Sequence, residues 1–310
     1  MNENNQHILK RLWIYQKERF PLFVNLIAVT TFTFSAISYS RICRGEDGFV
    51  DLGTFLIGCF ATFTLFFLVR VFDEFKDRED DLKYRSYLPV PRGLIKLSEL
   101  RNLGIIIGIT QIAVIAYFQL PMLWLYALVI VYLCLMGVEF FVGDWLKEHQ
   151  ILYITSHMII IPLLDIYSSG LDWLLAGAKP HWGLAFFFVV SYMNGLIGEF
   201  GRKMKSTEDE EEGVTSYTGM WGISKAVYIW VACIFFTMLV ASLAAYFAGY
   251  GLITFSVLFT LGLIASLAGF KFKAKPSKKS AKLVEAASGI WIIGMYLSLG
   301  GIPMIIDLIG

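Results

Sequence analysis

Long apolar stretches, separated by short polar connections, follow one another along nearly the whole chain. Each is about 20 residues or longer, the length that an α-helix needs to cross the hydrocarbon core of a bilayer. The pattern predicts about nine spans, whose approximate bounds are residues 21–43, 50–72, 101–119, 121–142, 151–169, 182–200, 222–248, 252–270 and 286–308. The expected fold is therefore an all-α integral membrane bundle of about nine transmembrane helices.

Composition agrees with this pattern. Of the 310 residues, 57% are hydrophobic and the mean hydropathy is +0.64, whereas soluble domains contain about 45–50% apolar residues. The net charge of +1 gives no reason to expect nucleic acid as a partner, and membrane lipid is the expected surroundings. The cysteines lie singly and without a CxxC pair, so neither a zinc site nor a disulfide framework is expected; they are Cys43, Cys59, Cys134 and Cys233.

The positive charges alternate along the chain in step with the spans. Lys and Arg crowd the first 20 residues and three later segments, at 76–101, 202–205 and 271–282. Cytoplasmic loops carry an excess of Lys and Arg, so we expect a cytoplasmic basic leader at 1–20, a cytoplasmic N-terminus and a C-terminus outside. An odd number of spans fits this alternation. Arg41 and Arg44, in the first connection, are an exception on the opposite side.

Three carboxylates spaced four residues apart follow the second span. Asp73, Asp77 and Asp81, here called the carboxylate ladder, would share one face of a helix. Like charges so close repel one another unless a cation lies among them, and Mg²⁺ favours oxygen ligands of this kind. The alternative is a solvated acidic helix end whose charges are balanced by nearby basic residues, namely Lys76, Arg78, Lys83 and Arg85.

A second charged segment follows the sixth span, on the side expected for the ladder. Glu199 stands at the very end of that span, where an unpaired carboxylate is costly and is usually functional. Two facing acidic clusters could hold a diphosphate only through bridging divalent ions, with basic groups on its oxygens. Those groups are Arg202, Lys203 and Lys205. The acids at 208–212 are also explained as a solvated, mobile loop.

The segment after the ladder is expected to return the chain to the membrane as a short, rigid basic loop. Pro89 and Pro91 prevent a helix from continuing, and Gly93 allows a sharp turn. Arg85 and Arg92 would face the same diphosphate, or would serve as ordinary basic anchors on the cytoplasmic side.

Polar residues inside the predicted spans are a further set of candidates, because polar groups in a membrane are expensive and tend to face the interior. They are Glu139, His157, Asp165 and Asn194. Asn194 lies about one turn before Glu199, and Tyr153 one turn before His157. His157 would orient or deprotonate an acceptor, or be satisfied by Asp165 or a neighbouring carbonyl. Pro162 predicts a kink in the fifth span.

These motifs resemble the UbiA superfamily of intramembrane prenyltransferases. The likeness lies in the ladder at 73–81, the pattern Arg-x-x-x-Pro-x-Pro-x-Gly at 85–93 and the second charged segment. It covers the chain from about residue 15 onward, so 21–310 is expected to form a single transmembrane domain. The resemblance implies helices bundled around a central cavity with a cytoplasmic cap, where two acidic motifs hold Mg²⁺ and a prenyl diphosphate.

Carried over residue by residue, the resemblance places Asp77 and Asp81 on metal-binding aspartates and Asp73 where the family often has Asn. The second motif departs from the common pattern. Aligning Gly213 with the family's glycine puts Asp209 on its last aspartate, and basic residues stand where acids are usual. Glu199 is expected to substitute as the acid nearest the membrane. The expected metal ligands are thus Asp73, Asp77, Asp81, Glu199 and Asp209.

The function implied is the Mg²⁺-dependent transfer of an isoprenoid chain from a prenyl diphosphate to an aromatic or quinone-like acceptor within the membrane. Asp73, Asp77, Asp81 and Glu199 would be catalytic, and the substrate-binding candidates are Lys76, Arg85, Arg92, Tyr153, His157, Asn194, Arg202 and Lys203. The alternative is a terpene cyclase on the same scaffold, which needs no acceptor. A transporter would call for inverted repeats or helices broken near mid-membrane, and neither is obvious.

Overall fold

The computed structural model describes residues 7–309, and within this range every regular element is a helix. Nine helical segments in this range, some made of two consecutive helices, are long and apolar enough to cross a membrane, which confirms the predicted spans. Their bounds are α2 Leu22–Arg44, α3 Leu52–Lys76, α5 Leu97–Phe118, Leu120–Gly137 (with α6 at Leu123–Gly137), Gln150–Trp173 (α8 and α9), α10 Leu184–Arg202, α12 Ile223–Phe247, α13 Gly251–Ala274 and Lys278–Ile309 (α14 and α15).

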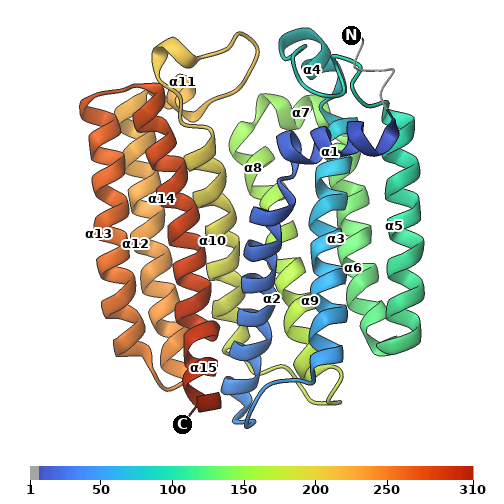
Figure 1. Ribbon diagram of the computed structural model, residues 1–310. Coiled ribbons are helices and arrows are strands. Elements are labelled where there is room, and N and C mark those ends of the chain that lie inside the picture. The colour runs from blue at the N-terminus through green and yellow to red at the C-terminus, as the bar shows by residue number, and fades with distance from the viewer. Residues whose placement is uncertain (1–6, 310) are drawn as a thin grey trace.

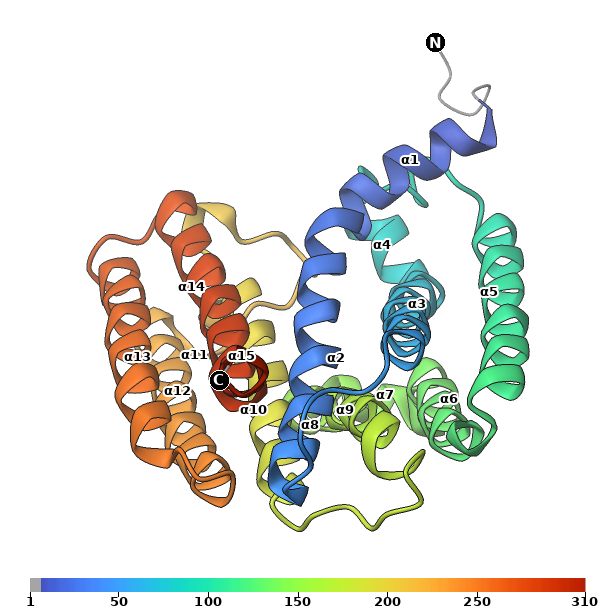
Figure 2. The same cartoon turned by 60° about the horizontal axis from the view of Figure 1, so that its bottom comes forward.

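The spans stand side by side as a bundle whose two ends differ (Figure 1). One end carries the short helices, namely α1 Ile8–Arg19, α4 Arg78–Tyr84, α7 Gly143–Glu148 and α11 Tyr217–Trp221. The last helix, α15 (Ile302–Ile309), lies at the opposite end from α1, as an odd number of spans requires. Seen towards that end, α12, α13 and α14 pack beside α10, and α3, α5 and α6 form the other side of the bundle (Figure 2).

Helix α1 lies across the end of the bundle and is firmly attached to it (Figure 1). The Arg11 guanidinium donates to both carboxylate oxygens of Glu99, at 2.9 and 2.6 Å. Tyr15 and Phe20 pack in a small core that includes Phe67 of α3. The described part of the expected leader, residues 7–20, is therefore folded onto the bundle, whereas residues 1–6 lie outside the described residues.

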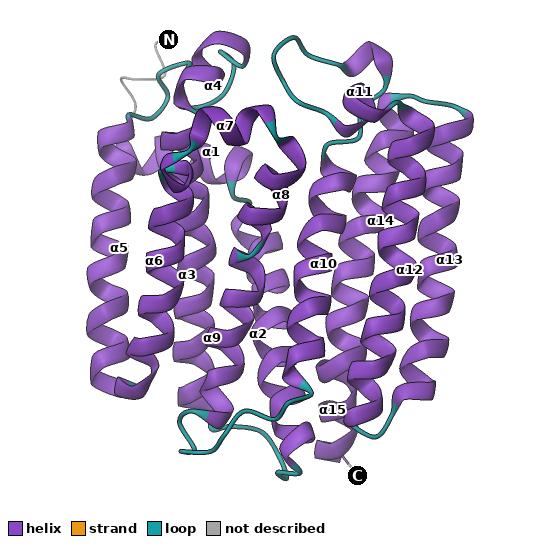
Figure 3. Ribbon diagram, turned by 180° about the vertical axis from the view of Figure 1, so that it is seen from behind, coloured by secondary structure: helices purple, strands orange, loops and turns teal. Residues whose placement is uncertain are grey.

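The fifth span is interrupted where its proline predicts a kink. Helix α8 (Gln150–Met158) ends two residues before α9 (Ile160–Trp173) begins, and the two are distinct in Figure 3. Pro162 has no N–H to donate to the Met158 carbonyl four residues earlier, so the regular helical hydrogen bonds cannot continue there. The predicted kink is confirmed, and it separates a short upper helix from the long lower one.

Arg41 and Arg44, the exception to the charge alternation, are neutralised inside the protein. Asp172, whose side chain is fully buried, accepts from Arg41 at 3.2 Å and from Arg44 at 3.1 and 3.3 Å. Ser40 donates to the same carboxylate at 2.7 Å. These arginines are therefore compensated within the fold, so they add little to the net positive charge of their connection.

The end of α14 (Lys278–Tyr296) continues as a π-helical turn, Leu297–Gly301, that packs closely on α2. A Cβ at Gly300 would lie 2.1 Å from the backbone oxygen of Ser35, closer than any real contact. Gly300→Ala is therefore expected to lower the free energy of unfolding by about 1–3 kcal/mol, the usual effect of overpacking. Unfolding in detergent would measure it, with Gly289→Ala as the control, because nothing lies within 4 Å of a Cβ there.

Candidate active site at the ends of α3 and α10

The carboxylate ladder spans the junction between α3 and α4. Helix α3 ends at Lys76, but the helical hydrogen bonds continue, since the Asp77 amide donates to Asp73 and the Asp81 amide to Asp77, at 2.9 and 2.8 Å. The side chains of Asp73 and Asp77 are 27% and 31% exposed, whereas that of Asp81 is 2% exposed. Side-chain exposure therefore falls along the ladder, from Asp73 and Asp77, which are partly exposed, to Asp81, which is buried.

Each carboxylate of the ladder has a basic side chain close to it. Lys76 Nζ lies 3.4 Å from Asp73 and 3.8 Å from Asp77, and Arg85 forms a close ion pair with Asp81. The local neutralisation considered from the sequence is therefore real for Lys76 and Arg85. Burial still raises the pKa of Asp77 and of Asp81 above the usual carboxyl range, against the opposing effect of those two cations.

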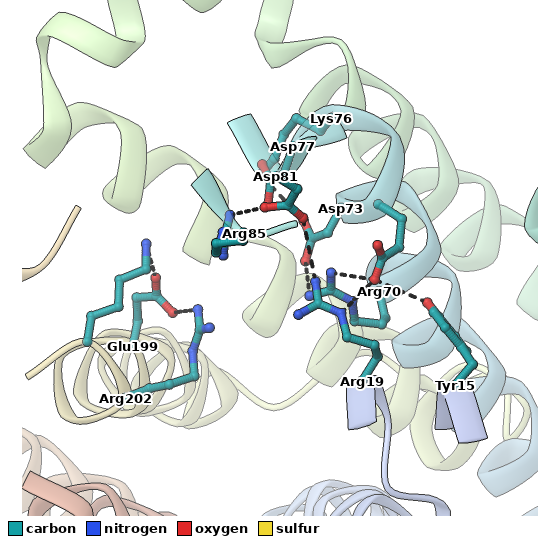
Figure 4. A network of polar contacts seen from close by, with 12 residues as sticks. Tyr15, Arg19, Arg70, Asp73, Lys76, Asp77, Asp81, Arg85, Glu199 and Arg202 are labelled. Carbon is teal, nitrogen blue, oxygen red and sulfur yellow. Dashed lines mark hydrogen bonds and ion pairs between the residues drawn. The ribbon is translucent and has the colours of Figure 1, made fainter. Parts of the chain in front are cut away.

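Sequence reasoning missed a fourth carboxylate, Glu74. Its side chain is 1% exposed, and its Oε1 accepts from Arg19 Nε at 2.7 Å and from the Arg70 guanidinium at 2.8 and 3.2 Å. Tyr15 also approaches that oxygen, at 3.4 Å. The two arginines continue to the ladder, where Arg70 lies 3.6 Å from Asp73 and Arg19 4.0 Å from Asp81 (Figure 4). The available signal was the Arg70–Glu74 spacing of four residues inside an otherwise apolar helix.

Helix α10 presents a second charged group, here called the α10 cluster, which consists of Glu199, Arg202 and Lys203. Lys203 Nζ lies 2.8 Å from Glu199, and Arg202 forms a close ion pair with the same carboxylate. Figure 4 shows Glu199 and Arg202 on one side and Arg85 and Asp73 opposite them. The two clusters therefore face each other at one end of the bundle.

The acidic residues after α10 accept hydrogen bonds from nearby hydroxyl groups. Asp209 accepts from Ser206, three residues earlier, and Glu210 accepts from Ser216 at 2.6 Å. Glu211 accepts from the Tyr87 hydroxyl at 3.0 Å, which joins this loop to the one after the ladder. Within the described chain, these contacts do not link Asp209 to Glu199 or to the ladder.

An aromatic wall lies beside the ladder. Lys76 Nζ is 5.2 Å from the centre of the Tyr153 ring, and that ring stacks on His157 with centroids 4.1 Å apart. The predicted pair on α8 is thus beside the acids. Asn194 is buried deeper, where its amide contacts the Met295 sulfur, and Arg92 forms an ion pair with Glu18 of α1 at 2.7 Å. The Asn194 side chain is not joined to the ladder by a described contact.

Among the described residues, no group of three or more His, Cys, Asp or Glu side chains is arranged to hold a metal ion. Two well-defined pockets lie elsewhere. One of ≈390 Å³ lies between α13 and α15 with Asp307 as its charged residue, and one of ≈320 Å³ lies between α1, α3 and α5. Their mainly apolar walls lack the clustered charges that would recognise an anionic group, so we assign the candidate site to the facing clusters.

Apolar helices that carry facing acidic and basic clusters at one end define an integral, multi-pass membrane protein with a polar site at the edge of the bilayer. The family model of the UbiA prenyltransferase family matches residues 29–293. The chain belongs to this family, and it is a prenyltransferase.

A solved structure described as digeranylgeranylglyceryl phosphate synthase in membranes has a similar fold, with a TM-score of 0.60 and 17% sequence identity. The likeness covers 95% of this chain and 99% of that chain. A comparison with curated proteins gives no match.

Proposed function

We propose that this chain moves an isoprenoid group from a prenyl diphosphate to an aromatic or quinone-like acceptor, in a Mg²⁺-dependent reaction inside the membrane. The observation that carries the proposal is the pair of facing charged clusters, the ladder on α3 and α4 and the α10 cluster. A diphosphate between them would meet basic groups from both sides, and its hydrocarbon chain would enter the apolar bundle.

The donor chemistry fits Mg²⁺. The candidate ligands Asp73, Asp77, Asp81 and Glu199 offer only carboxylate oxygens, which this hard ion prefers, and Asp209 is a further candidate from the loop. When bound, Mg²⁺ supplies Lewis-acid stabilisation of the diphosphate leaving group. The lysines and arginines that now neutralise these acids would then be free to contact the phosphate oxygens.

The chain's own residues have distinct proposed roles in the departure of the diphosphate. Lys76 and Arg85 on one side, and Arg202 and Lys203 on the other, stabilise the negative charge that develops on the leaving group. The ring of Tyr153 stabilises the allylic cation through its quadrupole. The apolar helices exclude water, which would otherwise capture that cation.

We also propose an orientation in the membrane. Residues 76–101, 202–205 and 271–282 are rich in Lys and Arg, which supports a cytoplasmic position for the end that carries the site and α1, with the C-terminus outside. Residues 21–310 are proposed to act as a single domain, with α1 as part of its cytoplasmic face.

The test is a product analysis of the purified protein in lipid nanodiscs. Prenyl diphosphates of increasing chain length are supplied with Mg²⁺, with and without aromatic or quinone-like acceptors, and products are identified by mass spectrometry. We expect a prenylated acceptor and an equal amount of diphosphate. A cyclised hydrocarbon formed without an acceptor would replace the proposal with the cyclase, and ion-driven uptake without any chemical product would indicate a transporter.

A further inference from the structure

One ring nitrogen of His157 makes a hydrogen bond, and the other has no hydrogen-bond partner in the described chain. Its Nδ1 lies 2.8 Å from the backbone carbonyl of Tyr153. A carbonyl oxygen only accepts hydrogen bonds, so Nδ1 carries the hydrogen, and Nε2 of the neutral ring is left with a lone pair. Nε2 is buried without a hydrogen-bond partner in the described chain. Of the two partners considered from the sequence, the neighbouring carbonyl is the one that His157 contacts, whereas Asp165 accepts from Tyr296 at 2.9 Å.

The imidazole ring is held from two sides. Tyr153 stacks on it at 4.1 Å with an interplanar angle of 15°, and Phe140 meets it edge-on at 5.8 Å and 90°. Phe140 belongs to a turn in which three consecutive residues other than glycine have positive φ, namely Glu139 (48°), Phe140 (54°) and Phe141 (62°). Each such residue costs about 1–3 kcal/mol and persists only where the surrounding structure enforces it.

The ring also lies close to the carboxylate ladder. The Tyr153 ring that stacks on His157 is 5.2 Å from Lys76 Nζ, and Lys76 pairs with Asp73 and Asp77 of the ladder. A fixed proton acceptor without a hydrogen-bond partner in the described chain therefore lies beside one of the two groups proposed to hold the diphosphate.

We propose that Nε2 of His157 is the base that removes the acceptor's proton during prenyl transfer; this rests on the proposed function. The bond from C1 of the prenyl group to the diphosphate oxygen breaks, and its electron pair leaves with the diphosphate. A bond forms from C1 to the attacking carbon or oxygen of the acceptor. The acceptor's proton passes to Nε2, and the resulting imidazolium later releases it to water. The acceptor class is therefore a hydroxylated aromatic or other protic nucleophile.

The test uses two variants in nanodiscs with a protic aromatic acceptor that the wild type prenylates. His157→Phe keeps an aromatic ring between Tyr153 and Phe140 but has no base, and His157→Ala leaves space for added imidazole. A general base contributes about 10²–10⁴-fold, so we expect both to lose at least 10²-fold in kcat for transfer, while KM for the prenyl diphosphate stays within about threefold. Imidazole is expected to restore His157→Ala, which a purely structural role would not allow.

His149 offers a matched control. It stacks on Trp145 at 4.4 Å, and its Nδ1 lies 2.8 Å from the Trp145 carbonyl, but it is exposed. His149→Phe and His149→Ala are expected to transfer like the wild type with or without imidazole. Transfer by His157→Phe within threefold of wild type, or no imidazole effect on folded His157→Ala, would overturn the proposal. A wild type that releases no diphosphate from any donor would instead refute the proposed function.

Discussion

Asp77→Ala is expected to lower the rate of diphosphate release by at least about 10²-fold while leaving the protein folded. The loss follows from the proposed role of this carboxylate as a Mg²⁺ ligand, because a bound metal ion supplies several kcal/mol of charge stabilisation to a departing phosphoryl group. The fold should tolerate the change, since the Asp77 side chain is 31% exposed and its described ion pair, with Lys76, is long at 3.8 Å. Diphosphate release in nanodiscs and thermal unfolding in detergent measure the two effects separately.

Asp80 supplies the matched control for this experiment. It lies in α4, three residues after Asp77, but its side chain is 53% exposed and pairs with Lys147 at 3.6 Å, away from the ladder. Asp80→Ala is expected to retain wild-type release and wild-type dependence on Mg²⁺. Asp81→Ala should lose activity as Asp77→Ala does, with some loss of stability because Arg85 loses its partner. Near-full turnover in both ladder variants would contradict the assignment of the site.

The spans and the ladder were predictable because each depends on a local property of the sequence. A run of about 20 apolar residues is sufficient to identify a membrane-spanning helix, and a spacing of four places Asp73, Asp77 and Asp81 on consecutive turns wherever the helix lies. The pairing of Tyr153 with His157 followed from the same spacing. These predictions needed no knowledge of which helices are neighbours.

Partnerships between distant segments could not be read from the sequence. Glu74 binds Arg19, 55 residues away, and Asp172 binds Arg41, 131 residues away, and only the packing of helices brings such pairs together. Arg92, expected to face the diphosphate or to serve as a basic anchor, forms an ion pair with Glu18 of α1, a contact that depends on how α1 lies across the end of the bundle. The place of Asp209 likewise depends on a loop whose path no periodicity sets.

Glu74→Gln is expected to lower the stability of the fold strongly and to weaken binding of the donor. The substitution keeps the shape of the side chain but removes the charge that compensates Arg19 and Arg70, whose side chains are only 13% and 18% exposed. Removing one partner of a buried ion pair typically costs about 3–5 kcal/mol, because the charge of the remaining partner is left uncompensated. We expect a loss of that size in the free energy of unfolding, together with a higher KM for the prenyl diphosphate.

The two effects are separable because α1 is anchored at two places. Arg11→Gln breaks the anchor to Glu99, away from the ladder, so it should loosen α1 and lower stability without changing the KM for the donor. Arg19→Gln acts at the other end of the same helix, where the guanidinium touches Glu74 and approaches Asp81, and should raise that KM. If Arg11→Gln and Arg19→Gln changed the KM equally, Arg19 would serve only to attach α1. If the KM rises in Arg19→Gln and Glu74→Gln alone, then Glu74 positions an arginine that α1 supplies to the diphosphate site.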